Sequence, residues 1–316
     1  MSNGHAPAPS IVDRLIALPL DQSLAVIFPG QGSQKVGMGL EACAASATAR
    51  AVYEIADQTL GFALSSLCAE GPADELTLTA NAQPAILATS IAILVGALEG
   101  GDLDRRPAFA AGHSLGQYSA LVAAGSLALE DALRLVRERG QLMGEAKTGT
   151  LAAIVGLDEQ TVTEICQESG AEVANYNAPT QTVVGGTPVA VERACALAKE
   201  RGGRGIPVNV SGAFHTSLME PAARAFAEVL HDTEVRDPVT PVIGNVSAEP
   251  LGSAEDVRAD LGAQIRSPVR WYQSMDFLQT AGVLRVMEVG PGQVLTNQLK
   301  RSHPGLEYYP WVKTLR

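Results

Sequence analysis

The stretch AAGHSLGQYSALV, residues 110–122, joins an apolar run to a helix-compatible segment through a serine flanked by glycines. The apolar residues 107–111 are typical of a buried strand, and the cluster Gly112-His113-Ser114-Leu115-Gly116 follows them. A buried strand, a sharp turn and a helix whose first N–H groups face the serine together form a nucleophile elbow. Flanking glycines remove the Cβ atoms that would clash in such a strained turn. We therefore predict that Ser114 is a catalytic nucleophile; the alternative is an ordinary glycine-rich turn.

The length and composition predict an α/β protein around this turn. A chain of 316 residues can hold one large domain, or a large domain with a smaller insert. Hydrophobic residues make up 46% of the chain but aromatic residues only 4%, so a sizeable core must consist of aliphatic side chains. Such a core is usual for a parallel sheet covered by helices.

The formal net charge of −11 argues against nucleic acid or an anionic membrane as a partner. An acidic partner would need a local basic patch.

The longest apolar stretch, residues 85–98, is shorter than the ~20 residues that a membrane span requires. The N-terminus lacks the basic start of a signal peptide, so we expect a cytoplasmic protein.

The cysteines are scattered and include no C-x-x-C pair. This distribution predicts neither a disulfide framework nor a metal site, and it suits a reducing compartment. We interpret all of them as small packed residues: Cys43, Cys68, Cys166 and Cys195.

The order of apolar and turn segments divides the chain into three parts. Residues 1–22 are predicted to be a flexible N-terminal extension, in which 11–20 could form a short helix ended by Pro19. Residues 149–210 follow the order β-α-β-β-α-β of a ferredoxin-like subdomain. Residues 23–148 and 211–316 form the large α/β subdomain around it. A ligand cleft is expected at the junction, because subdomain junctions favour pockets.

A second glycine loop follows the apolar strand LAVIF, residues 24–28. It reads Pro29-Gly30-Gln31-Gly32-Ser33-Gln34 and does not have the spacing of a phosphate-binding P-loop. Loops at the carboxyl ends of parallel strands are where α/β sheets place ligands. A tight structural turn and a ligand loop are equally good interpretations of this segment.

Among the five histidines, His215 is the best candidate for a general base, because it follows a strand end at the subdomain junction. His113 abuts the nucleophile but should point away from it in an elbow. A packed or surface histidine is the alternative for His215. On the predicted helix 129–146, Gly140 is unusual, and it would permit a close approach beside Arg139. Arg134 and Arg137 are interpreted as solvated surface.

Several separated motifs, in this order, resemble those of the malonyl-CoA:acyl-carrier-protein transacylase family, which also supplies the acyltransferase domains of polyketide synthases. The resemblance covers about residues 24–299. Any one motif is weak, but their conjunction is highly specific. The motifs are FPGQGSQ (28–34), GHSLGQYSAL (112–121), LVRERGQLM (135–143), NYNAPTQ (175–181), SGAFH (211–215), AQIRSPVRW (263–271) and EVGPG (288–292).

The resemblance implies the chemistry of the site. Ser114 would take an acyl group from coenzyme A as an oxyester, with His215 as the base. The backbone carbonyl of Gln264, rather than a carboxylate, would orient this histidine. The backbone N–H groups of Leu115 and Gln31 would form the oxyanion hole.

The resemblance also implies a substrate-binding set. Arg139 would hold the malonyl carboxylate through its planar guanidinium. A bulky Phe214 before the histidine resembles the pattern that selects malonyl over methylmalonyl. Many family members carry glutamate where this chain has Gln117. The remaining residues of the predicted set are Asn175, Asn177 and His113.

The implied fold is an α/β-hydrolase-like large subdomain with the ferredoxin-like insert. The implied activity is ping-pong transfer of malonyl from malonyl-CoA to holo acyl carrier protein for fatty-acid biosynthesis, by a monomer without metal or redox cofactor. The alternatives are a trans-acting polyketide acyltransferase, a serine thioesterase or other hydrolase, and an inactive docking module. An acidic carrier would dock on local cations, which are Lys199, Arg201 and Arg204, or Arg266, Arg270, Lys300 and Arg301.

Overall fold

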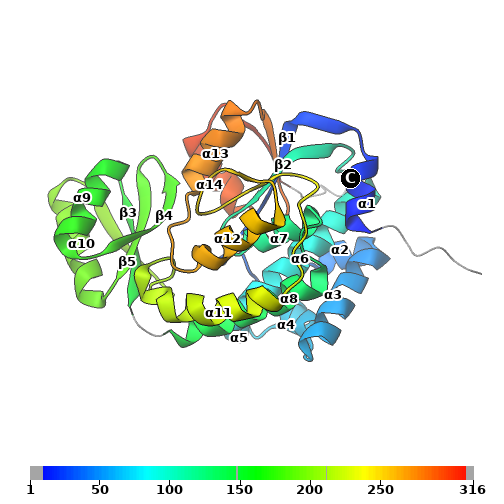
Figure 1. Ribbon diagram of the computed structural model, residues 1–316, viewed down its shortest axis with the longest axis horizontal. Coiled ribbons are helices and arrows are strands. Elements are labelled where there is room, and N and C mark those ends of the chain that lie inside the picture. Colours follow the sequence, from blue (N-terminus) through cyan, green and yellow to red (C-terminus); the bar gives the residue numbers. More distant parts are fainter. Residues whose placement is uncertain (1–9, 147–148, 211, 311–316) are drawn as a thin grey trace, which may run out of the picture.

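In the computed structural model, which describes residues 10–146, 149–210 and 212–310, a small subdomain lies beside a larger one (Figure 1). The larger one is built on a six-stranded sheet with the order β10-β9-β1-β2-β7-β8. Its neighbouring strands pair in parallel, except for β7 and β8. This confirms the predicted parallel α/β core. The strands are β1 (Leu20–Phe28), β2 (Arg106–Gly112), β7 (Val242–Ile243), β8 (Pro250–Leu251), β9 (Arg285–Glu288) and β10 (Glu307–Pro310).

The N-terminal boundary differs from the one predicted. Helix α1 (Ile11–Ala17) begins with a capping box between Ser10 and Asp13, and β1 begins at Leu20. The large subdomain therefore starts before residue 23. The first residues of β1 are more exposed than the rest, so an apolar run reveals only the second half of this strand. Residues 1–9 of the predicted extension lie outside the described residues.

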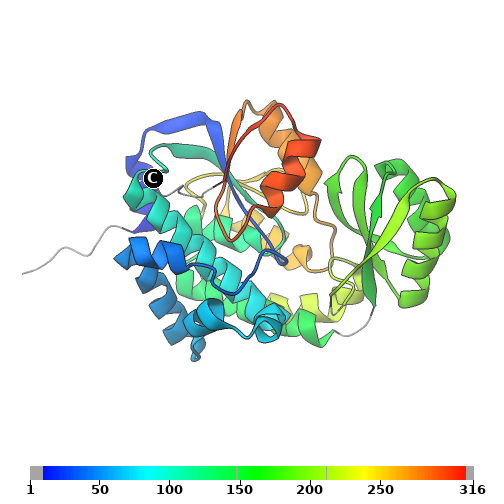
Figure 2. The same cartoon turned by 180° about the vertical axis from the view of Figure 1, so that it is seen from behind.

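Alternate residues of β1 serve the cores on the two faces of the sheet. Val26 and Phe28 point into the larger cluster, and Ala25 and Ile27 into the smaller one. Figures 1 and 2 show the helices of the smaller cluster opposite the others. The face with the smaller cluster is covered by α13 (Trp271–Thr280) and α14 (Val294–Ser302). The helices that pack on the larger cluster are α2 (Leu40–Ala45), α3 (Ala47–Leu60), α4 (Leu64–Glu70), α5 (Ala73–Thr77), α6 (Thr79–Gly100), α7 (Gly116–Ala123), α8 (Leu129–Glu145), α11 (Glu220–Asp232) and α12 (Ala254–Gln264).

Helix α6 is the central helix of the larger core, and it continues through Pro84. A proline inside a helix leaves the carbonyl four residues before it without a partner. That carbonyl, of Ala80, accepts a hydrogen bond from Arg137 Nη1 at 2.8 Å. Arg137 is therefore half-buried and structural, rather than solvated as predicted. By length and composition α6 could cross a membrane, but 83% of its apolar window is buried inside the protein, as in a core helix.

The small subdomain has the predicted element order and an antiparallel sheet with the order β4-β5-β3-β6. Two helices cover one face of this sheet. Backbone hydrogen bonds of 2.9 Å join Val269, just before α13, to Ala174 and Tyr176 of β4, so the large subdomain grips this edge. The elements are β3 (Thr150–Val155), α9 (Glu159–Ser169), β4 (Glu172–Ala178), β5 (Gln181–Gly186), α10 (Pro188–Glu200) and β6 (Arg204–Val208).

Candidate active site

The two glycine loops meet at the carboxyl edge of the large sheet. Strands β1 and β2 are parallel neighbours with Phe28 opposite Gly112, so the loop after β1 lies beside the turn that carries Ser114. A Cβ at Gly30 would lie only 2.5 Å from the carbonyl oxygen of His113. The loop can approach the turn this closely only because residue 30 is glycine.

The turn at Ser114 has the geometry of a nucleophile elbow. Ser114 adopts a φ of 51°, a left-handed conformation that costs free energy for a residue other than glycine. A Cβ at Gly116 would lie 2.1 Å from the carbonyl oxygen of Phe28, and one at Gly112 would lie 1.9 Å from the backbone of Gly116. Both flanking glycines are therefore required by close backbone contact, as the sequence predicted.

His215 lies directly beside the serine. Its Nε2 is 2.8 Å from Ser114 Oγ, and its Nδ1 is 2.8 Å from the backbone carbonyl oxygen of Gln264. The backbone of His215 is also held, because its N–H donates to the carbonyl of Ile265 at 3.0 Å. The ring of His215 is thus oriented by a main-chain carbonyl at the end of α12, the contact that the resemblance implied.

The surroundings of His215 keep its imidazole neutral. Burial, together with the positive charge of Arg139, lowers the pKa of His215 to about 3. A neutral imidazole has one N–H. The carbonyl oxygen of Gln264 can only accept a hydrogen bond, so this N–H is at Nδ1 and donates to it. Nε2 is then left as an acceptor for the hydroxyl proton of Ser114.

Arg139 is a buried cation in contact with Ser114. Its side chain comes from α8 and is 1% exposed. Nη2 donates to Ser114 Oγ at 3.0 Å and to Gln264 Oε1 at 2.9 Å, while Nη1 donates to Gln83 Oε1 at 2.8 Å. Gly140 lets α8 approach α6 here, since a Cβ would lie 2.6 Å from the carbonyl oxygen of Thr79. Arg139 forms no ion pair with any carboxylate in the described part of the chain.

A cavity of about 300 Å³ opens over these side chains at the junction of the subdomains. The N–H groups of Gln31 and Leu115 donate to no backbone or side-chain acceptor in the described part of the chain, so both are available to an oxyanion. A second cavity of about 580 Å³ adjoins the first and shares four lining residues with it. The predicted site residues that line the first cavity are Gln31, His113, Ser114, Leu115, Arg139, Asn175, Asn177, Phe214 and His215.

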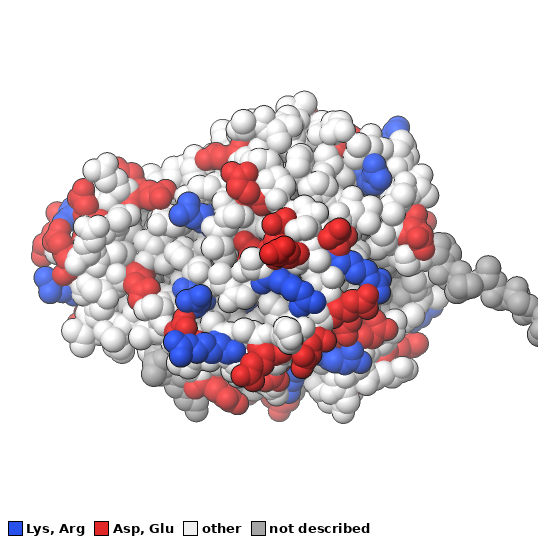
Figure 3. Space-filling view, viewed as in Figure 1, with Lys and Arg blue, Asp and Glu red and all other residues white. Residues whose placement is uncertain are grey.

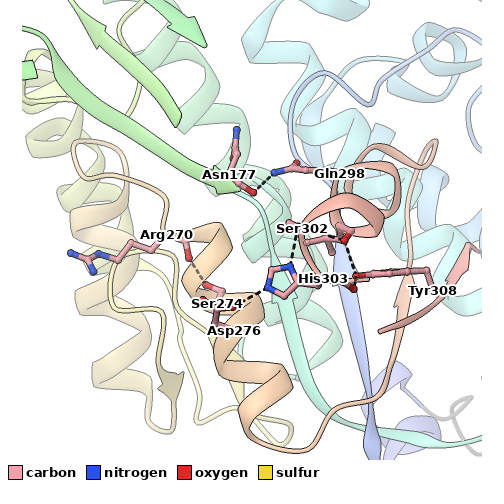
Figure 4. A network of polar contacts seen from close by, with 9 residues as sticks. Asn177, Arg270, Ser274, Asp276, Gln298, Ser302, His303 and Tyr308 are labelled. Atoms are coloured by element: carbon pink, nitrogen blue, oxygen red, sulfur yellow. Dashed lines mark hydrogen bonds and ion pairs between the residues drawn. The ribbon is translucent and has the colours of Figure 1, made fainter. Parts of the chain in front are cut away.

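His113 forms part of the cavity wall. Its Nε2 lies 2.9 Å from Asn177 Oδ1, and its ring packs against the edge of Trp271. Burial lowers the pKa of His113, which keeps the ring neutral. The carbonyl of Asn177 accepts a hydrogen bond from Gln298 of α14, as Figure 4 shows. A residue near the C-terminal end of the chain thus supports Asn177, which lines the cavity.

His303 is buried, and its ring bonds to side chains that do not line the cavity. Figure 4 shows its ring between Asp276 and Ser302, with distances of 3.1 Å to Asp276 Oδ1 and 2.9 Å to Ser302 Oγ. His303 therefore links the end of α14 to α13. The assignment of His215 as the histidine beside the serine agrees with this placement.

Sequence reasoning missed the residues that support the site from below. Asn245 Oδ1 accepts the N–H of Ser114 at 2.7 Å, and Asn245 Nδ2 donates to the carbonyl of Gly112 at 2.7 Å. Asp260 and Gln83 are buried partners of Gln117 and Arg139. No spacing marks these residues, because each is a single polar residue on an element of ordinary pattern. Among the described residues, no group of three His, Cys, Asp or Glu side chains could hold a metal ion.

The site is a Ser–His pair on a strand–turn–helix elbow of a parallel α/β sheet, with a buried arginine beside it. Residues 26–306 match the family described as the acyl transferase domain. The chain therefore belongs to the acyl transferase domain family, as its motifs predicted.

Relatives and solved structures agree with this membership. The chain is 47% identical over 287 residues to malonyl CoA-acyl carrier protein transacylase of Bacillus subtilis (strain 168), a match covering 88% of this chain and 90% of the relative. A solved acyl carrier protein S-malonyltransferase of Vibrio cholerae has a TM-score of 0.88 and 39% identity, covering 91% of this chain and 96% of that one. A malonyl-transacylase solved with its type II polyketide acyl-carrier protein has a TM-score of 0.88 and 40% identity, covering 91% and 95%.

Proposed function

We propose that this protein is an acyl-carrier-protein S-malonyltransferase. It transfers the malonyl group from malonyl-CoA to the phosphopantetheine thiol of a holo acyl carrier protein through a malonyl ester on Ser114. The observation that carries this proposal is the environment of Arg139. Its guanidinium is buried, contacts Ser114 Oγ and has no carboxylate partner among the described residues. A buried charge is costly unless it is paired, so the site favours an acyl group that brings its own carboxylate.

In the first half-reaction, Ser114 Oγ attacks the thioester carbonyl carbon while His215 Nε2 takes the hydroxyl proton. The N–H groups of Leu115 and Gln31 support the negative charge that develops on the carbonyl oxygen. Collapse of the tetrahedral species breaks the C–S bond, and His215 returns the proton to the departing coenzyme A thiolate. The product is the malonyl ester of Ser114.

The second half-reaction reverses these roles with a different thiol. His215 takes the proton of the carrier's pantetheine thiol, and the sulfur attacks the ester carbonyl. Ser114 Oγ leaves and regains the proton from His215. Both substrates use one site in turn, so the kinetics are ping-pong. Every proton and charge in this sequence is handled by side chains and amides of the chain, without a metal or redox cofactor.

The orientation of His215 by a backbone carbonyl favours transfer over hydrolysis of the Ser–His–acid type. Intact-mass measurement after mixing the protein with malonyl-CoA tests this directly. A stable malonyl adduct that disappears on addition of holo carrier supports the proposal. Rapid release of free malonate in the absence of carrier would instead identify a thioesterase. Fatty-acid and polyketide carriers are compared in the same experiment, and we expect faster transfer to the fatty-acid carrier.

The proposed partner is an acidic carrier protein, but the surface of this protein carries both acidic and basic side chains. On the face shown in Figure 3, basic side chains lie among acidic ones rather than forming one broad patch. Arg201 is paired with Glu164 and Glu168, and Arg266 with Glu220, so these two cations are partly neutralised. The other candidates for docking are exposed and form no ion pair with a described residue: Lys199, Arg204, Arg270, Lys300 and Arg301. We propose a cytoplasmic monomer that binds neither nucleic acid nor membrane.

The low pKa of His215 predicts that acylation of Ser114 does not slow near pH 6.5, where an ordinary histidine gains its proton. A protonated histidine cannot accept the serine proton, but a pKa of about 3 leaves His215 neutral well into the acidic range. We expect kcat/KM for malonyl-CoA to stay flat from about pH 8 down to about pH 5.5. A roughly tenfold loss per pH unit below the ordinary histidine pKa would contradict this assignment.

Phe214 is proposed to disfavour an α-methyl branch on the acyl group. The ring is buried and lines the cavity, so shortening it should open space beside the bound acyl chain. We expect Phe214→Ala to raise the ratio of kcat/KM for methylmalonyl-CoA to that for malonyl-CoA by roughly tenfold, since one methyl group in a pocket changes discrimination by about 10–200-fold. An unchanged ratio would remove Phe214 from the selectivity set.

A further inference from the structure

Beneath the elbow, a buried carboxylate is connected to Arg139 by two glutamine side chains. Gln117 Nε2 donates to Asp260 Oδ2 at 2.7 Å. Gln264 Nε2 donates to Gln117 Oε1 at 2.6 Å, and Arg139 Nη2 donates to Gln264 Oε1 at 2.9 Å. All four side chains are buried. An anion and a cation are thus joined by hydrogen bonds within the protein.

The two ends of this chain of hydrogen bonds fix its direction. An ionised carboxylate only accepts hydrogen bonds, and a guanidinium only donates them. Gln117 must therefore turn its nitrogen toward Asp260 and its oxygen toward Gln264. Gln264 must in turn direct its nitrogen to Gln117, which leaves its oxygen for Arg139. Reversal of any amide would leave buried donors facing each other.

Asp260 also supports the backbone of the elbow. Its carboxylate accepts the backbone N–H groups of Asn245 at 3.2 Å and Val246 at 3.1 Å. The side chain of Asn245 then spans the turn by bonding Gly112 and Ser114, as described above. The same carboxylate therefore holds both the segment that grips the nucleophile and the start of the connection to Arg139.

We propose that Asp260 is a positioning residue that acts through Gln117 and Gln264 on Arg139, and through Asn245 on Ser114. Its negative charge offsets the buried guanidinium without pairing with it directly, which leaves Arg139 open to a substrate carboxylate. This inference rests on the proposed function, because malonyl transfer is its readout.

Gln117 and Asp260 act as one unit in this proposal. A glutamate at position 117, which the family resemblance would suggest, would place a second carboxylate against Asp260 Oδ2, where Gln117 Nε2 now lies at 2.7 Å. The two negative charges would repel in a site from which water is excluded. A donor at either position and a carboxylate at the other restores a matched pair.

The test compares Gln117→Glu, Asp260→Asn and the double variant in the full chain. We expect each single change to lower kcat/KM for malonyl-CoA by roughly 10–100-fold, because each leaves unmatched buried groups. In the double variant, the new amide at 260 donates to the new carboxylate at 117, which still accepts from Gln264, but the N–H of Asn245 loses its acceptor at Oδ2. We therefore expect partial recovery, with kcat/KM above that of either single variant, a non-additivity typical of directly coupled residues.

Acetyl-CoA separates positioning from general stability. Gln117→Met removes the link without burying a second charge, and it should lower the ratio of malonyl to acetyl transfer because Arg139 loses its orientation. Glu255→Gln, an exposed change on α12, the helix that carries Asp260, is the control and should alter neither rate. Additive losses in the double variant, or a Gln117→Met ratio equal to that of the wild type, would overturn the proposal. A wild-type protein that cannot transfer malonyl would reject the proposed function instead.

Discussion

Replacing Ser114 with alanine will abolish the covalent malonyl adduct and reduce malonyl transfer by about 10³–10⁶-fold, because removal of a catalytic nucleophile leaves only binding and the oxyanion hole. Ser114 lines the cavity, and its Oγ lies 2.8 Å from His215 Nε2. Intact-mass measurement after incubation with malonyl-CoA gives the occupancy of the adduct. Transfer to holo carrier in the same samples gives the rate.

Ser119→Ala provides the matched control for this loss. Ser119 is a buried serine of α7, the helix that begins at the elbow, and its hydroxyl makes no hydrogen bond to a described residue. We expect the adduct to form in this variant at the wild-type level. An adduct of full occupancy in Ser114→Ala would show that another residue carries the acyl group and would overturn the site.

Replacing Arg139 with alanine will reduce kcat/KM for malonyl-CoA by about 10²–10³-fold, because loss of one partner of a buried charged pair costs roughly 3–5 kcal/mol. Transfer of acetyl, which has no carboxylate, will be largely spared. The physical reason is that the guanidinium lies in the cavity without a protein carboxylate to pair with. Steady-state rates with malonyl-CoA and acetyl-CoA measure the two effects side by side.

Arg134→Ala is the corresponding control, since Arg134 is exposed on the same helix and pairs only with Asp131 among the described residues. This variant should transfer both acyl groups at the wild-type rate. Equal loss of malonyl and acetyl transfer in Arg139→Ala would show that Arg139 acts only through its hydrogen bond to Ser114 Oγ, and would contradict a role in carboxylate binding.

The overall architecture could be predicted because it depends on patterns that are local in the sequence. The apolar run before Gly112, the glycines of the elbow and the six-element order of the small subdomain each mark their own structure. Family membership followed from several motifs in a fixed order. Short strands with few apolar residues are hard to place from sequence, and β7 has only two residues.

The supporting residues could not be predicted because their roles depend on partners far away in the chain. Asp260 lies 143 residues from Gln117, and nothing in the pattern of α12 distinguishes it from a surface carboxylate. Gln117 was an open question in the sequence alone. Its side-chain nitrogen faces a buried carboxylate, so an amide suits this position in this chain.

The small subdomain is inserted between Ser114 and His215, so the site is assembled from two separate segments of the chain. Ser114 and His215 are 101 residues apart in sequence, and the whole small subdomain lies in that interval. Neither segment of the large subdomain contains both members of the pair. Closing so long a loop has a substantial entropic cost, which the packing of the insert and its grip on Val269 help to offset. Both segments of the large subdomain are therefore needed to bring Ser114 and His215 together.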